Sequence, residues 1–278
     1  MVCSKICELQ VHGGDEKMSN YDTVMRYLRS NPLKNITPLK MLTAYHQVMD
    51  SHLLEQGKEW GVVLLLPADA YYYDRQIYPE ANYVVLMDYT SPELLPDLIG
   101  RIPADARLVF KLQEEAGEAI APYFPLTPVR RFYSYSSVPG HSYIPDGQAI
   151  VSSRLDERLL PLWMENGYTT VEIEEYFQDG AFSVALYGGV TPLSTCIVFR
   201  NEEQIWEIGA VHTAASGRRQ GLAARVLRTA LHHTLERGYI PRYQVQDTNT
   251  PSIRLAEASG LKLAVKLQHW INYTPQQK

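Results

Sequence analysis

Cysteine is scarce in this chain: only three of its 278 residues are cysteines, at positions 3, 7 and 196. Three scattered cysteines cannot build a disulfide framework. Cys3 and Cys7 have no later cysteine or histidine at zinc-binding spacing, so we expect no metal site. Long apolar runs are lacking too. The longest, residues 62–67, is far shorter than the ~20 residues needed to span a bilayer.

An excess of positive charge is also lacking, because 26 Lys and Arg stand against 31 Asp and Glu, for a net charge of −5. This balance gives no reason to expect a nucleic-acid or membrane partner. The chain opens without a charged-then-apolar leader, so we expect a cytoplasmic protein. Its length predicts about two domains, and an apolar content of 45% is ordinary for chains with real cores.

What the sequence does contain is a strand, a turn and a long helix over residues 205–237. Ile205 to Thr213 has the β-branched and aromatic content of a buried strand. From Leu222 onward, apolar residues recur every four positions along two adjacent rows, which predicts one broad apolar helix face. Gly238 suits a left-handed helix end.

The turn between this strand and helix is predicted to bind an anion. The first N–H groups of a helix are unpaired and positive, so helix starts usually collect Asp or Glu. This start has none: Arg218 and Arg219 precede Gly221, and the next three residues are small or apolar. Phosphate is the natural ligand, although the spacing matches neither a P-loop nor a dinucleotide fingerprint. The alternative is an ordinary turn with surface arginines.

Two motifs resemble a known family. Arg218-Arg219-Gln220-Gly221-Leu222-Ala223 is similar to the [Q/R]-x-x-G-x-[G/A] signature of the GCN5-related N-acetyltransferases (GNAT). Downstream, Asn249-x-x-Ser252-x-x-Leu255-Ala256-x-x-x-Gly260-Leu261 resembles the family's second motif, except that many members have a tyrosine general acid where Ala256 stands. The FR47-like branch, close to the glycine N-acyltransferases, often has Leu-Ala here and matches better. The resemblance covers about residues 150–271.

The resemblance implies acetyl-CoA (coenzyme A) as the cofactor. In the family the turn's N–H groups hold its pyrophosphate, and the preceding strand pairs with the pantetheine arm. The cofactor-binding residues implied are Val211, His212, Thr213, Arg218, Arg219, Gln220, Gly221, Leu222, Ala223, Ala224, Asn249 and Ser252. Asn249 has an alternative role, which is only to cap the helix that follows it.

Glu207 is the candidate catalytic residue. Some family members carry a glutamate general base at this offset, and on a strand Glu207 shares a face with Gly209 and Val211. The alternative, held about equal, is a structural carboxylate paired with a neighbour. The resemblance implies an N-acetyltransferase in which a primary amine attacks the thioester directly. The acceptor, a small molecule or a peptide, is not readable, and a homodimer is left open. The rival is a non-catalytic acyl-CoA-binding or interaction protein, motivated by Ala256 and by a first half without a site.

The predicted fold class is α/β (α+β), a GNAT fold with a mixed, mostly antiparallel sheet in the C-terminal half. We expect a mobile tail over 1–18, a smaller α+β accessory domain over 19–147, resembling a degenerate GNAT unit, and the acetyltransferase domain over 148–278. Residues 136–147, rich in proline and glycine, are the predicted linker, and we expect the part after it to bind coenzyme A alone. In the first half the patterns predict a helix from Thr37 to near Gly57, and a strand edge or aromatic loop over 70–74.

Overall fold

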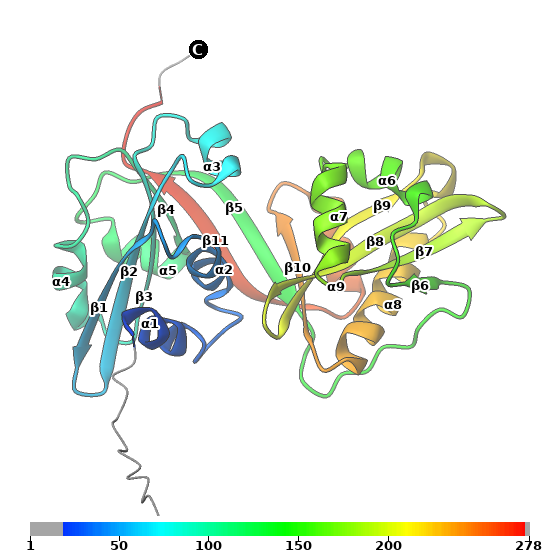
Figure 1. Ribbon diagram of the computed structural model, residues 1–278, viewed down its shortest axis with the longest axis horizontal. Coiled ribbons are helices and arrows are strands. Elements are labelled where there is room, and N and C mark those ends of the chain that lie inside the picture. The colour runs from blue at the N-terminus through cyan, green and yellow to red at the C-terminus, as the bar shows by residue number, and fades with distance from the viewer. Residues whose placement is uncertain (1–18, 276–278) are drawn as a thin grey trace, which may run out of the picture.

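The computed structural model describes residues 19–275, so the tail expected over 1–18 lies outside the described residues. The chain forms two lobes, and long strands pass from each lobe into the other (Figure 1). Up to residue 136 the elements are α1 (Asn20–Leu28), α2 (Ile36–Tyr45), β1 (Asp50–Gln56), β2 (Glu59–Pro67), α3 (Tyr72–Ile77), β3 (Tyr83–Tyr89), η1 (Pro92–Leu94), α4 (Leu95–Ile99), β4 (Leu108–Gln113), α5 (Glu114–Ile120) and β5 (Thr127–Ser136). From residue 150 they are β6 (Ile150–Ser152), η2 (Glu157–Leu159), α6 (Leu160–Met164), α7 (Thr170–Gln178), β7 (Phe182–Gly188), β8 (Thr191–Glu202), β9 (Ile205–Thr213), η3 (Ala215–Gly217), α8 (Leu222–Glu236), β10 (Ile240–Gln246), α9 (Thr250–Ala258) and β11 (Lys262–Ile271).

One mixed sheet runs through both lobes, in the order β1-β2-β3-β4-β11-β5-β10-β9-β8-β7-β6. Among the described strands only two neighbouring pairs are parallel, β3 with β4 and β9 with β10. The predicted fold class, with a mixed and mostly antiparallel sheet, is therefore confirmed. No helix within residues 19–275 is both long and apolar enough to cross a bilayer.

The last strand of each half completes the lobe of the other half. β5 ends the first half of the chain but pairs with β10, where Tyr135 lies opposite Tyr243 and is buried in the core of the second lobe. β11 ends the second half but pairs with β4, where Trp270 lies opposite Phe110 in a core of the first lobe. The two exchanged strands also pair with each other. The proposed boundary near residue 148 stays a prediction, but the hydrogen bonding of the sheet does not divide there.

The two halves repeat one order of elements: antiparallel strands, a parallel pair connected through a helix, a second helix and a final strand. In each half the parallel contact covers three register pairs. In the first lobe apolar Met87 and Leu112 lie beyond it, and the cavity they help to line holds only about 20 Å³. The connection there begins with Pro92 and Glu93, with no glycine turn before a long helix. The first half thus has the order of the second without its open site.

Two local predictions in the first half are wrong. The helix expected from Thr37 to near Gly57 ends at Tyr45, and residues 50–56 form β1 instead. Gly57, with φ of 65°, turns the chain so that β1 pairs along the buried strand β2, and this pairing overrides a pattern that also suited a helix. The aromatic stretch at 70–74 leads into the short helix α3, where buried Asp74 binds Lys111 of β4.

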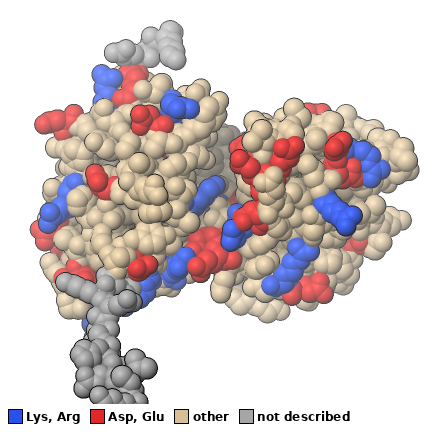
Figure 2. Space-filling model, in the orientation of Figure 1, with Lys and Arg blue, Asp and Glu red and all other residues tan. Residues whose placement is uncertain are grey.

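The predicted linker is packed against the second lobe. Residues 137–149 contain no helix or strand, yet Asp146 binds Arg225 of α8, with Oδ2 and Nε 2.5 Å apart. The Tyr143 carbonyl lies 2.9 Å from His232 Nδ1 on the same helix. The lobes also meet through Arg29, which binds Glu202 and Glu203, and acidic and basic side chains gather where the lobes join (Figure 2).

Candidate functional site

The site lies where β9 and β10 diverge in the second lobe. Their parallel pairing ends at Glu207 and Arg242. Beyond this point the strands separate around a cavity of about 300 Å³, lined by Gly209 to Val211 from β9 and by Tyr243 to Gln246 from β10. Because neighbouring strands normally satisfy each other's backbone groups, separated strands offer theirs to a ligand. We call this cavity the strand cleft.

Glu207 closes the base of the strand cleft and is almost fully buried. Its Oε2 accepts hydrogen bonds from Arg242 Nη1 at 2.6 Å and from Asn201 Nδ2 at 3.1 Å. Its Oε1 accepts one from the backbone N–H of Gln244, also at 3.1 Å. The carboxylate therefore satisfies the first β10 backbone donor after the ladder ends, which fixes the point where the strands diverge. The catalytic role of Glu207 stays a prediction, and its pairing matches the structural alternative.

A β-bulge in β9 changes the direction of the strand where it lines the cleft. The register with β8 shifts between Thr195 and Ile197, and opposite this shift Ala210 has φ of 51°, in the left-handed region. Such strain in a non-glycine residue persists only where the surroundings enforce it, and it gathers at functional sites. Gly209 is required beside it, because a Cβ there would lie 2.8 Å from the Tyr168 hydroxyl.

The turn before α8 has the geometry of an anion site. Arg219 and Gly221 have φ of 63° and 72°, and α8 begins with neither a side-chain cap nor an acidic residue in its first turn. Within residues 19–275, no protein acceptor takes a hydrogen bond of ordinary length from the backbone N–H groups of 219–224. A Cβ built on Gly221 meets nothing within 4 Å, so the approach is open. Six adjacent donors at a helix start fit a phosphate.

The side chains of the turn serve mainly to shape it. Arg218 Nε donates to the Thr213 carbonyl at 3.2 Å, and Gln220 Nε2 donates to the Ser216 carbonyl at 2.9 Å. Both bonds hold the loop in place. The Arg218 bond uses only Nε, so the rest of its guanidinium and the backbone N–H groups of 219–224 both remain available for an anion among the described residues.

Residues of α9 border the other side of the cleft. Asn249 caps α9 by accepting from the backbone N–H of Ser252 at 3.2 Å, and both residues also line the strand cleft. The two roles weighed for Asn249 are therefore compatible. Ala256 is fully buried in the core of the second lobe and is not part of the cleft lining. Ala256 therefore cannot act as the general acid that a tyrosine supplies at this position in many family members.

Two tyrosines in the cleft were missed from the sequence. Tyr168, in the loop between α6 and α7, and Tyr243, on β10, both line it. Burial is the main cause that raises the pKa of each hydroxyl, so both stay protonated at neutral pH. Tyr168 belongs to no motif, and Tyr243 lies in a short alternating strand. Only the three-dimensional fold brings them beside the cleft.

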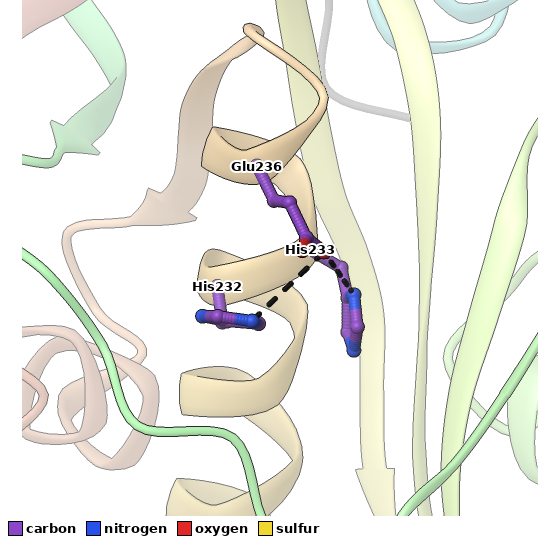
Figure 3. Close-up of side chains that lie close together, drawn as sticks. All are labelled: His232, His233 and Glu236. Carbon is purple, nitrogen blue, oxygen red and sulfur yellow. Dashed lines mark hydrogen bonds and ion pairs between the residues drawn. The ribbon is translucent and has the colours of Figure 1, made fainter.

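Among the histidines, His212 follows the cleft-lining Val211 on β9, whereas His232 and His233 on α8 lie apart from the cleft. His212 contacts Glu165 and Asn166. His232, His233 and Glu236 lie together on the last turns of α8, with their possible ligand atoms within 4.8 Å of one another (Figure 3). They are roughly ten residues beyond the start of α8, which at 1.5 Å per residue places them ~15 Å from the anion site. This cluster takes no part in the cleft.

A second cavity adjoins the strand cleft and was not predicted. It holds about 170 Å³ and is lined from both lobes: α2 and β4 contribute Lys40 and Lys111, and β10 contributes Arg242 and Gln244. Gln244 lines both cavities, and the Glu207–Arg242 ion pair has one partner in each lining. We call this second cavity the interlobe pocket.

Comparison with known proteins points to one family. Residues 151–261 match the acetyltransferase (GNAT) family. No curated protein sequence matches the chain. Among solved structures, it is similar to an acetyltransferase of the GNAT family from Colwellia psychrerythraea, with a TM-score of 0.59, 12% identity, and 92% of this chain and 98% of that chain covered. A GCN5-related N-acetyltransferase from Kribbella flavida is similar with a TM-score of 0.55 and 16% identity, over 90% of this chain and 96% of that chain. A tandem GNAT protein from the clavulanic acid biosynthesis pathway is similar with a TM-score of 0.51 and 10% identity, over 93% of this chain and 97% of that chain.

These structural overlaps run through both lobes, so the two-lobed architecture is shared, and at such identities they show the fold alone. The family match is confined to residues 151–261, and it is this part of the chain that is similar to the acetyltransferase (GNAT) family. The superfamily resemblance found in the sequence is confirmed. Nothing in the comparisons singles out the FR47-like branch, which stays a prediction.

Proposed function

We propose that this protein is an N-acetyltransferase that uses acetyl-CoA and a primary amine, with direct attack of the amine on the thioester. The observation that carries the proposal is the continuity of two features. The unpaired N–H groups of residues 219–224 follow directly on β9, whose cleft edge is open to a ligand. An elongated ligand with phosphates at one end and an amide-containing arm at the other fits this arrangement.

The residues present fit acetyl-CoA, which would supply an activated acetyl thioester. The turn at 219–224 would hold its pyrophosphate through backbone donors. The β9 edge from Val211 to Thr213 would pair with the arm, and Asn249 and Ser252 would border it on the α9 side. The bulge at Ala210 would turn a backbone N–H toward the carbonyl that becomes negative, which is electrostatic stabilisation by a preorganised donor.

Proton transfer is the harder step to assign. An ammonium with pKa near ~10 is almost wholly protonated at pH 7 and cannot attack, whereas a thiolate with pKa near ~8.5 leaves readily. A base therefore matters more than an acid. Glu207 Oε1 faces the cleft and accepts only the Gln244 N–H among described donors, so it can still bind a water that relays the proton. Tyr168 and Tyr243 line the cleft and are protonated, so either would be able to donate a proton to the thiolate that leaves.

The anion site is tested by Gly221→Glu. The added carboxylate would lie beside phosphate and block the turn, so coenzyme A affinity should fall tenfold or more, by calorimetry. Gly189→Glu is the matched control, because Gly189 also has positive φ, 65°, with nothing within 4 Å, but lies in the β7–β8 turn. Equal affinities of two folded variants would place the cofactor elsewhere.

The rival function, a non-catalytic acyl-CoA-binding protein, is favoured by two observations. Ala256 offers no acid, and Glu207 is held by three donors. Release of free thiol from acetyl-CoA, measured across a panel of primary amines, separates the two functions. Coenzyme A binding with no amine-dependent thiol release would support the rival.

A further inference from the structure

We propose that the interlobe pocket binds the acceptor, and that the acceptor is a small amine carrying an anionic group, a carboxylate or a phosphate. This inference rests on the proposed acetyl transfer. It follows from where the pocket lies, from which of its charges are already paired, and from what those charges do to an amine.

The position of the pocket suits an acceptor site. It lies between α2 of the first lobe and β10 of the second, and it meets the strand cleft at Gln244. The proposal requires that an amine in the pocket reach the cleft past Gln244, the residue that both linings share. Its apolar lining, from Met41, Phe132 and Leu267 among others, suits the carbon skeleton of a small molecule.

The charges of the pocket leave one cation over. Lys111 is paired with Asp74, with Nζ and Oδ2 2.7 Å apart, and Arg242 is paired with Glu207. Lys40, on α2, has no hydrogen bond or ion pair with any residue of the described part, 19–275. Lys40 lines the pocket and is also exposed to solvent, so its ammonium is accessible to an anion that enters the pocket.

The unpaired cation also acts on the reacting amine. Lys111 and Arg242 are compensated by Asp74 and Glu207, so it is Lys40 that disfavours an ammonium in the pocket by like charge and favours the free amine that can attack. A simple cationic amine would be repelled for the same reason. An amine that also carries an anion can bind, because Lys40 pairs with the anion while the pocket favours the neutral amine. This assistance matters where the nearby carboxylate, Glu207, is already hydrogen-bonded.

The test compares amines that differ only in the anionic group: L-phenylalanine with phenethylamine, and O-phosphoethanolamine with ethanolamine. Binding is measured by calorimetry on the full chain with coenzyme A present. We expect at least one anionic member to bind tenfold or more tightly than its partner. Lys40→Gln should remove that difference, whereas Lys58→Gln, at an exposed lysine in the β1–β2 turn, should retain it. The pair that responds tells carboxylate from phosphate.

Two results would overturn the inference. In the first, neither anionic amine binds more tightly than its partner without the anionic group. In the second, the tighter binding of the anionic amine is retained in Lys40→Gln. Acetyl transfer to the same amines is measured separately. Anion-dependent binding through Lys40 without turnover would leave the pocket assigned and contradict the proposed transfer. Turnover with no anion preference would do the reverse.

Discussion

At the scale of single residues, Glu207 is where structure changes most of what the sequence suggested. Its position on β9 was readable, but its partner Arg242 lies 35 residues further along the chain. The buried pair makes Glu207 a residue that holds the cleft open, whether or not it also accepts a proton. The two roles differ in their dependence on pH.

We expect Glu207→Gln to lower both stability and turnover. Loss of the charge leaves buried Arg242 unpaired, which should reduce the free energy of unfolding by about 3 kcal/mol or more. If Glu207 also relays the proton, kcat should fall by ~10²-fold, and the defect should shrink as pH rises and free amine accumulates. Urea unfolding and a pH–rate profile measure the two effects.

Glu203→Gln is the matched control, because Glu203 is exposed and pairs with Arg29 at the surface. It should change neither quantity much. A folded Glu207→Gln variant with wild-type kcat at every pH would leave Glu207 with its structural role alone.

His269 on β11 predicts a pH dependence of stability. Burial above all, then Lys111 and Arg130, holds its pKa well below the usual value, and its Nδ1 lies 2.8 Å from the Tyr78 hydroxyl. The folded protein therefore keeps His269 neutral while the unfolded chain takes up a proton below pH ~6.5. Stability should fall as pH falls through that range, by about 1 kcal/mol between pH 6.5 and 5.5 from this residue.

His269→Gln should lose that share of the pH dependence, and unfolding in urea at several pH values measures it. His46→Gln, at an exposed position, serves as the control. The same slope in both variants would mean that other groups set the acid sensitivity.

At the scale of elements, the orientation of α9 decides what the second motif can do. Ala256 faces the core shared by α8 and β10 rather than the cleft. The sequence placed Ala256 in a family motif but could not say which side of the helix it occupies. The strand, turn and helix over 205–237 were predictable, because local spacing and the lack of acid at the start of α8 determine them.

Ala256→Tyr should therefore destabilise the protein instead of restoring an acid. A tyrosine has no space in a fully buried alanine position, and overpacking costs about 1–3 kcal/mol or more. Thermal unfolding of Ala256→Tyr and of Ala258→Tyr, at an exposed position of the same helix, makes the comparison. A stable Ala256→Tyr variant with raised kcat would show that the ring reaches the cleft.

At the scale of the whole molecule, the exchanged strands β5 and β11 make the folding of each lobe depend on the other. We expect residues 148–278 alone neither to fold cooperatively nor to bind coenzyme A, contrary to what the positions of the motifs suggest. β11 has both of its neighbours, β4 and β5, in the missing part, and β10 loses β5. Circular dichroism and calorimetry on the fragment measure this, and adding residues 1–147 should restore binding.

The control is the full chain cut at the exposed Gly140, which keeps every strand and should keep its affinity. A lone fragment that is folded and binds coenzyme A as tightly as the intact chain would show that β5 and β11 are dispensable.

The sequence by itself determined the turn before α8, the strand that precedes it and the helix that follows it. Each of these elements depends on residues that are close together in the sequence, so local propensity and spacing are enough to predict it. Tertiary structure alone decided the exchange of β5 and β11, the pairing of Glu207 with Arg242, the burial of Ala256 and the place of Lys40 in the interlobe pocket. These depend on contacts between segments far apart in the chain, which are fixed by which surfaces pack together and leave no local pattern to read.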